Sequence, residues 1–272
     1  MAPLPAHPDI WRLAAFVSVF ALLAVLEQAR PRRTRTVSQS RRWLANLSIV
    51  AIDTVAARLA FPLAPFALAG LAQARGWGLF HLWPIPAGFE VAASVLLLDL
   101  LIYTQHRLFH RLPLFWRIHR MHHTDLDLDV SSGTRFHPLE ILLSLAIKLA
   151  AVALLGASPL AVLVFEILLN ATSMFSHANL RLPLPLDRWL RLVVVTPDMH
   201  RVHHSVIVRE TDSNFGFNLP WWDRLFGTYI PQPREGHEGM RIGLKEWRNQ
   251  DELDLWPLLK IPFIATPTVK QP

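Results

Sequence analysis

Long apolar runs constrain this chain more than any other feature. Residues 9–29 are predominantly apolar, and a helix of that length crosses a hydrocarbon core of about 30 Å at 1.5 Å per residue. Similar runs cover about 43–66, 88–105 and 139–176. The last is interrupted at residues 156–159 (GASP), a turn signal that divides it into two arms of about nineteen residues. We therefore predict an all-α integral membrane protein with four to five transmembrane helices, the last two forming a short hairpin.

The overall composition agrees with a membrane protein. Only 18% of the residues are charged, whereas soluble domains carry about 25%. Residues 1–8 lack the positive segment of a secretory signal, and no cleavage site of small residues follows. We therefore expect the first run to be a retained membrane helix.

A basic segment without acids follows the first apolar run. It could be a nucleic-acid patch or a juxtamembrane anchor, and a short loop between two spans is where the positive-inside rule places arginine. We favour the anchor and expect no nucleic-acid partner. Counting crossings from a cytoplasmic arginine loop puts residues 106–137 and 177–272 on the cytoplasmic face, as a histidine-rich helical cap. The membrane would be the inner, cytoplasmic one. The basic segment contains Arg30, Arg32, Arg33, Arg35, Arg41 and Arg42.

Two opposite charges lie within the interrupted run. Lys148 and Glu166 are each nine residues from Ala157, so antiparallel arms would hold them at similar depth. An isolated charge there is costly, so we predict that they pair. The alternative is a snorkelling lysine with a glutamate that faces polar protein.

Histidine dominates the chemistry that is available to this chain. The sequence has 13 histidines and no cysteine, which excludes disulfides, thiolate metal sites and a cysteine nucleophile. Ten of the histidines lie between residues 106 and 204, and His-Arg-x-His-His occurs at both 119–123 and 200–204. On a helix, positions i, i+3 and i+4 share one face, so each motif can direct two or three imidazoles to one point.

These histidines could be surface residues at a membrane interface. Crowded imidazoles would repel one another when protonated, however, unless a metal keeps them neutral. One zinc takes three or four protein ligands, so nine or ten histidines point to two metals with four or five nitrogens each. Imidazole suits iron, zinc, copper and nickel alike. The lack of a carboxylate-rich motif argues against magnesium and calcium.

The order and spacing of several segments are highly specific. These segments are 99–110 (DLLIYTQHRLFH), 113–123 (PLFWRIHRMHH), 136–140 (FHPLE), 175–179 (FSHAN), 196–205 (TPDMHRVHHS), 214–216 (NFG) and 222–229 (WDRLFGTY). With them, the chain resembles the membrane-bound fatty acid hydroxylase/sterol desaturase superfamily over about residues 88–230. We predict three parts: N-terminal transmembrane helices with a basic loop at 1–87, the catalytic domain at 88–230, and a Pro-rich, irregular tail at 231–272.

The resemblance implies a di-iron centre that activates O2 and hydroxylates or desaturates a lipid C–H bond. His137 lies in a His-Pro-x-Glu element and is predicted to be either a ligand or a residue that orients one. The remaining His7, His81 and His237 are expected to be surface residues. The resemblance implies nine further ligands: His106, His110, His119, His122, His123, His177, His200, His203 and His204.

Several other residues are candidates to support these ligands. Asp99 and Tyr103 share a helical face with His106 and His110, and an acid in a membrane helix is a functional candidate. Asp99 is about 10 Å along the axis from His106, so we expect it to orient another imidazole or to bond Tyr103; the alternative is helix packing. Trp221 and Trp222 are expected to be interfacial anchors rather than pocket walls. Weaker candidates for support are Asp125, Glu140, Asp198, Asp212 and Asn214.

The predicted function is that of a lipid oxygenase. Breaking an unactivated C–H bond needs a metal–oxygen oxidant, and a lipid could enter sideways from the bilayer into a site that excludes water. The sequence has no GxGxxG run and no haem-like segment, so we expect a separate electron-transfer protein or reductase. The alternatives are a zinc-dependent hydrolase of the membrane interface and a metal transporter or sensor. Transporter ligands lie within the spans, however, whereas these histidines fall at helix ends.

Overall fold

A computed structural model describes residues 7–265. The described chain is helical and contains no strands apart from two isolated bridges, between Pro31 and Leu180 and between Ser205 and Ile242. This confirms the predicted all-α class. The longer helices are α1 (Pro8–Ala29), α2 (Gln39–Ala60), α3 (Pro65–Arg75), α5 (Ala87–Arg111), α6 (Pro113–His123), α7 (Pro138–Leu155) and α8 (Pro159–His177).

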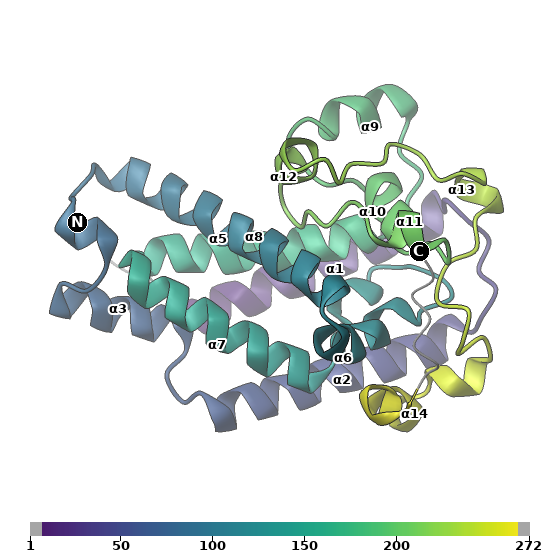
Figure 1. Cartoon of the computed structure of the whole chain (residues 1–272), viewed down its shortest axis with the longest axis horizontal. Coiled ribbons are helices and arrows are strands. Elements are labelled where there is room, and N and C mark those ends of the chain that lie inside the picture. Colours follow the sequence, from purple (N-terminus) through teal and green to yellow (C-terminus); the bar gives the residue numbers. More distant parts are fainter. Residues whose placement is uncertain (1–6, 266–272) are drawn as a thin grey trace.

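Five helical stretches of the described chain are long and apolar enough to cross a membrane. They are α1, the stretch Gln39–Leu82 that begins with α2, and then α5, α7 and α8. These helices run side by side along the long axis of the molecule (Figure 1). Half of the apolar window of α8 is buried, against 6% of that of α1, so α8 is central and α1 peripheral. The chain is an integral membrane protein, as the sequence predicts.

The predicted bounds differ from the structure at two places. The second span ends at Ala60 rather than near residue 66, because prolines 62 and 65 prevent one continuous helix. The chain then forms α3 and the short α4 (Leu79–Leu82), and α3 lies at the end of the bundle opposite α10 (Figure 1). The third span continues through Arg111, one turn beyond His106, so that α5 carries two histidines on its buried face.

The α7–α8 hairpin is as predicted. Gly156 ends α7 in the left-handed conformation at φ 68°, where an added Cβ would also collide with the carbonyl oxygen of Trp77. Ser158 caps α8, and Pro159 occupies its first turn. The Lys148 Nζ lies 3.4 Å from the Glu166 Oε1, which confirms the predicted pair.

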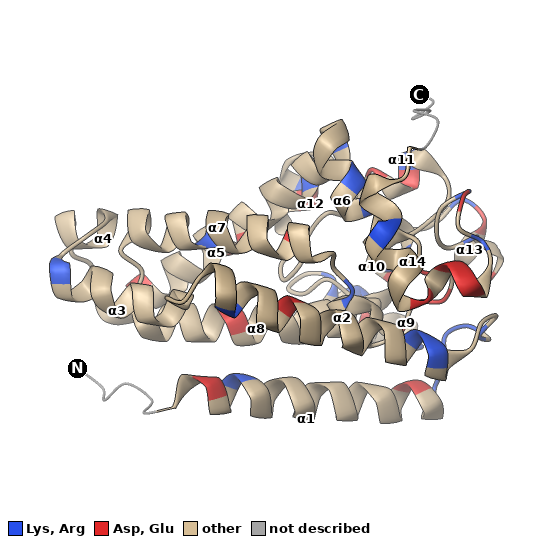
Figure 2. Ribbon diagram, turned by 90° about the horizontal axis from the view of Figure 1, so that it is seen from below, with Lys and Arg blue, Asp and Glu red and all other residues tan. Residues whose placement is uncertain are grey.

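A cap of short helices covers one end of the bundle and contains much of the charge (Figures 1 and 2). It is formed by α6, by the short helices after α8, and by the segment between α6 and α7. The predicted irregular tail contains four short helices up to residue 263, and its Leu258 and Ile261 are fully buried against Ala45, Ile49 and Met121 of α2 and α6. The short elements are η1 (Ser132–Thr134), α9 (Leu184–Leu190), α10 (Pro197–His203), α11 (Val208–Thr211), α12 (Trp221–Leu225), α13 (Gly236–Gly239), η2 (Gln250–Leu253), α14 (Leu255–Lys260) and η3 (Ile261–Phe263).

Part of the basic segment packs inside the cap instead of facing lipid. Arg42 is fully buried, and its guanidinium donates to Asp125 Oδ1 at 2.7 Å and to Asp129 Oδ2 at 2.6 Å. Arg32 contacts Asp198 at 3.1 Å. The expectation of a simple juxtamembrane anchor is therefore wrong for these two arginines, because acids from distant segments of the cap surround them.

Candidate metal centre

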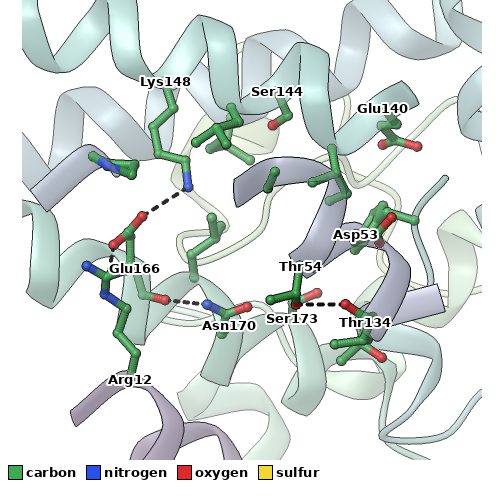
Figure 3. Close-up of a pocket in the computed structure, with 18 of the residues that line it drawn as sticks. Arg12, Asp53, Thr54, Thr134, Glu140, Ser144, Lys148, Glu166, Asn170 and Ser173 are labelled. Atoms are coloured by element: carbon green, nitrogen blue, oxygen red, sulfur yellow. Dashed lines mark hydrogen bonds and ion pairs between the residues drawn. The ribbon is translucent and has the colours of Figure 1, made fainter. Parts of the chain in front are cut away.

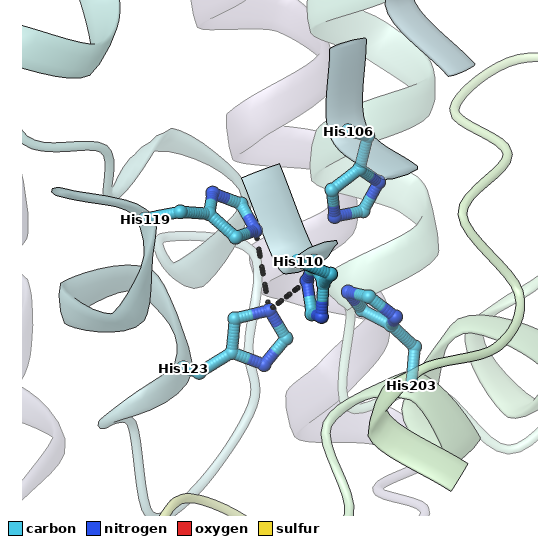
Figure 4. A group of neighbouring side chains, drawn as sticks. All are labelled: His106, His110, His119, His123 and His203. Carbon is cyan, nitrogen blue, oxygen red and sulfur yellow. Dashed lines mark hydrogen bonds between the residues drawn. The ribbon is translucent and has the colours of Figure 1, made fainter. Parts of the chain in front are cut away.

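Nine of the ten predicted histidines meet in two buried groups. Within each group, one ring nitrogen from every histidine lies within 4.8 Å of those of the others. Figure 4 shows the rings of the first group turned towards a common centre. The first group is His106, His110, His119, His123 and His203, and the second is His122, His177, His200 and His204.

Four elements supply these rings. α5 contributes His106 and His110, one turn apart on its buried face, and the last residue of α8 is His177. α6 and α10 carry the two His-Arg-x-His-His motifs, and each begins with a proline that fixes its first turn. Thr196 further sets the start of α10, because its hydroxyl accepts from the amide of Met199.

Each repeated motif is divided between the two groups. On α6, His119 and His123 belong to the first group and His122 to the second. In the motif at residues 200–204, His203 belongs to the first group, and His200 and His204 belong to the second. Each motif therefore directs two imidazoles to one group, as expected, and its third imidazole to the other group. α6 and α10 lie between the two groups and contribute to both.

Hydrogen bonds to carbonyl oxygens define the protonation of four rings. A carbonyl oxygen can only accept, so the Nδ1 atom of each of these rings carries the proton and the neutral ring keeps its lone pair on Nε2. The donor–acceptor distances lie between 2.7 and 3.0 Å. The pairs are His106 with Phe215, His122 with Arg135, His177 with Ser173, and His203 with Ser213.

The Nε2 atoms fit a metal better than they fit one another. The Nε2 atoms of His122 and His177 are 3.0 Å apart, although both are the unprotonated nitrogens of their rings. The buried Nε2 atoms of His106 and His203 have no hydrogen-bond partner among residues 7–265. Imidazole nitrogens lie about 2.0–2.1 Å from a zinc-sized ion, which spaces neighbouring ligands by about 3.0–3.4 Å. The donor set therefore fits a cation in each group.

Burial keeps the cap histidines neutral. Removal from water disfavours the imidazolium form, and neighbouring histidines add repulsion. The neutral form is the one that binds a metal. The pKa is lowered well below the usual histidine value in His122, His123, His200, His203 and His204.

Two carboxylates contact the outer nitrogens of the first group. Glu140 Oε1 accepts from His119 Nδ1 at 2.7 Å, and Asp212 Oδ1 accepts from His110 Nδ1 at 3.2 Å. Carboxylates at this position fix the tautomer and the orientation of a ligating ring. Glu140 is 4% exposed, so its bond is shielded from water. The sequence named both acids as weaker candidates.

Asp99, one of the stronger candidates, bonds to residues 218–222 instead of to a histidine. Asp99 accepts from the Trp222 indole at 2.8 Å and from the amides of Asn218 and Leu219. The expectation that Asp99 orients an imidazole or bonds Tyr103 is wrong, because the segment that supplies the Phe215 carbonyl lies against this face of α5. Trp222 is thus neither a free interfacial anchor nor a pocket wall.

The remaining candidates hold the backbone around the site. Tyr103 bonds the hydroxyl of Thr228 at 2.9 Å. Asp198 pairs with Arg32 and Arg201, and burial lowers the pKa of Arg201 to about 10. Asn214 donates to the carbonyl oxygens of residues 199 and 230 at 2.8 Å each.

His137 lies outside both groups. It caps α7, where its Nδ1 accepts from the Leu139 amide at 3.1 Å, while Nε2 donates to the Leu259 carbonyl at 3.2 Å. Of the three predicted surface histidines, His7 is exposed and His81 is half-buried. His237 is buried beside Asp198, and burial lowers its pKa to about 4, so the prediction is wrong for His237.

Sequence reasoning missed two features of the site. The first is the set of backbone carbonyls that accept from the Nδ1 atoms, which no residue type signals. The second is a cavity of about 810 Å³ that extends from His106 and His119 between the membrane helices to Lys148 and Glu166. Figure 3 shows polar side chains along it, including Asp53 of α2.

Taken together, the fold and the site define an integral membrane protein with a buried two-part histidine site at one end of its helical bundle. The fatty acid hydroxylase family model matches residues 91–228. The chain belongs to this family, and it is an oxidoreductase. No solved structure matches the chain.

Its curated relatives include lipid hydroxylases and monooxygenases. The ornithine lipid hydroxylase OlsE of Rhizobium tropici is 29% identical over 83% of this chain and 69% of its own length. An alkylglycerol monooxygenase of Danio rerio is 31% identical over 57% of this chain and 34% of its own length. Methylsterol monooxygenase 2-2 of Arabidopsis thaliana is 26% identical over 60% of this chain and 62% of its own length.

Proposed function

We propose that this chain is a non-haem di-iron oxygenase that hydroxylates or desaturates a C–H bond of a membrane lipid, using O2 and external electrons. The observation that carries the proposal is the pair of buried groups with five and four imidazole nitrogens. A cavity that extends from His106 and His119 of the first group between the membrane helices would give a lipid access to this group. The proposed catalytic unit is residues 88–230, with membrane helices at 1–87 and a C-terminal segment at 231–272.

The proposed ligands are the nine grouped histidines. The five-nitrogen group exceeds the three or four protein ligands that zinc takes, which favours iron over the zinc hydrolase. When bound, the two irons would supply the oxidant that side chains lack. His137 is not included, because both of its nitrogens already have partners in the cap.

The chain's own residues have three tasks in this scheme. Glu140 and Asp212 hold the Nδ1 protons of His119 and His110, so that Nε2 faces inward. The carbonyl oxygens of Phe215 and Ser213 do the same for His106 and His203. The buried walls exclude water, which protects a strong oxidant from side reactions.

The orientation and the partners are part of the proposal. The arginine loop supports a cytoplasmic cap in the inner membrane, where a soluble or membrane-bound electron-transfer protein would deliver electrons. The names of the relatives support a lipid substrate, since they refer to ornithine lipid, alkylglycerol and methylsterol.

Comparative lipid mass spectrometry tests this function. Cells that express the wild-type chain should contain a lipid that differs by one added oxygen or two lost hydrogens from its counterpart in cells with His122→Ala. His81→Ala is the matched control, because His81 lies outside both groups, and it should retain the product. Identical lipid profiles in wild-type and His122→Ala cells, at equal protein levels, would contradict the proposal.

A further inference from the structure

The cavity next to the histidines has polar walls, although it lies between membrane helices. Figure 3 shows Asp53, Glu140 and Ser144 towards one side of it and Lys148, Glu166 and Arg12 towards the other. A purely hydrocarbon ligand would leave these groups desolvated without compensation, which is costly. A ligand that fills this space must therefore bring polar groups of its own.

The charges far from the histidines compensate one another. Glu166 lies 3.4 Å from the Lys148 ammonium and 3.2 Å from the Arg12 guanidinium, and Arg12 also pairs with Asp9. In this part of the cavity the two acids Asp9 and Glu166 are therefore paired with the two cations Arg12 and Lys148.

The histidine end is different, because three of its buried acceptor atoms have no donor among the described residues. Asp53 is 8% exposed, Gln105 is 9% exposed and Glu140 is 4% exposed. In each of these residues a buried side-chain oxygen has no hydrogen-bond partner among the described residues: Asp53 Oδ1, Gln105 Oε1 and Glu140 Oε2. All three residues line the cavity together with His106 and His119.

The charge balance at this end is also negative. Glu140 already accepts from His119 through its other oxygen. Asp53 takes part in no ion pair within residues 7–265. A buried carboxylate normally has a cationic or hydrogen-bonding partner. The group missing from this end is therefore a positively charged donor with several N–H bonds.

We infer that Asp53, with Gln105 and Glu140, binds the ammonium of an amine-bearing lipid head group next to the histidine centre. An ammonium carries three N–H donors and one positive charge, which matches three orphaned acceptor oxygens and one uncompensated carboxylate. This inference builds on the proposed function, because it assigns the head-group chemistry of the lipid that the oxygenase takes. Asp53 is then the residue that selects amine-bearing lipids over neutral ones.

Equilibrium binding without O2 tests the inference separately from turnover. The probes are an ornithine-containing lipid with one free amine and the same lipid with that amine acetylated, added to the metal-loaded full chain in detergent. Charge-assisted hydrogen bonds contribute about 1.5–3 kcal/mol, equivalent to about 10- to 100-fold. The free amine should therefore bind at least about 10-fold more tightly than the acetylated form.

Variants assign the preference to Asp53. Asp53→Asn should remove most of the preference, while Asp53→Glu should retain it. The matched control is Asp9→Asn, which removes the same charge from a side chain that is 75% exposed on the same cavity, and it should leave the preference unchanged. Equal binding of both lipids by the wild-type chain, or a preference that survives Asp53→Asn, would overturn the inference.

The two proposals fail in different ways. In one outcome, the chain prefers the amine in binding but forms no oxidised product when O2 and electrons are supplied. That result contradicts the oxygenase and leaves the ammonium site intact. An oxidised lipid product with no amine preference contradicts the ammonium site and leaves the oxygenase. The lipid comparison on the wild-type chain does not depend on whether the Asp53 variants fold.

Discussion

The Nε2 atoms of His122 and His177 are 3.0 Å apart, and both of these rings donate from Nδ1 to a backbone carbonyl. Two neutral imidazoles with this arrangement point lone pairs at each other, which is repulsive. Burial lowers the pKa of His122, so protonation at neutral pH does not relieve the repulsion. His122 and His177 could both hold a bound cation through Nε2, which would replace this repulsion with an attraction, so we expect the fold to be most stable when loaded.

Metal removal should destabilise the protein. A ligand present at about 1,000 times its Kd stabilises the folded state by about 4 kcal/mol, and a chelator removes this contribution. Thermal unfolding in detergent should show a lower Tm after chelation, and Fe(II) should restore it. An unchanged Tm after verified metal removal would show that the nine rings pack stably by themselves.

Glu140 should matter more than Asp212 for metal retention. The Glu140 side chain is 5% exposed and 2.7 Å from its histidine, while Asp212 is 37% exposed and 3.2 Å away. Loss of such an orienting group costs about 10- to 100-fold in metal affinity. We expect Glu140→Ala to reach this range, Glu140→Gln to lose less because it keeps an acceptor, and Asp212→Asn to lose least. Competition with a chelator measures all three, and equal affinities would contradict the assignment.

Arg42 should be a main contributor to the stability of the cap. It is fully buried between Asp125 and Asp129, and its charge holds the pKa of Asp125 at about 2 despite burial. Removing one partner of a buried pair costs about 3–5 kcal/mol, so Arg42→Met should lower the free energy of unfolding by that amount. Arg41→Met is the control, because Arg41 pairs at the surface, and its Tm should stay near that of the wild type. Denaturant unfolding compares the two, and similar losses in both would refute the prediction.

Lys148 and Glu166 should be energetically coupled. Exchanging the two charges is a poor test, because a lysine at position 166 would face Arg12, which shares Glu166. A double-mutant cycle with Lys148→Met and Glu166→Gln avoids this repulsion. Contacting charges couple by about 0.5–3 kcal/mol, so the double variant should be more stable than the sum of the single losses implies. Strict additivity in thermal unfolding would mean that the pair contributes nothing.

The sequence predicted the features that depend on local pattern. Helix length and hydropathy indicated the spans, the residues around Gly156 indicated the hairpin, and equal spacing from Ala157 indicated the Lys148–Glu166 pair. These signals are readable because each depends on residues of one helix or of two helices joined by one turn. The nine side chains that meet were predicted from the resemblance to the family, because they come from four separate helices.

Features that depend on how distant segments pack were not predictable. The division of each motif between two groups follows from the placement of α6 and α10 between them, and Asp99 meets the segment near Trp222 rather than an imidazole. Burial of Arg42 requires two acids more than 80 residues away. Asp53 lies within a membrane span, and only the cavity shows that it lines the same space as His106 and His119.

The iron content of the purified chain tests the central claim most directly. The account predicts two irons per wild-type chain by elemental analysis, with a marked loss in His123→Ala and in His177→Ala, one from each group, and no loss in His137→Ala. One iron or none per chain after anaerobic loading with Fe(II), or full occupancy by zinc that iron cannot replace, would contradict it.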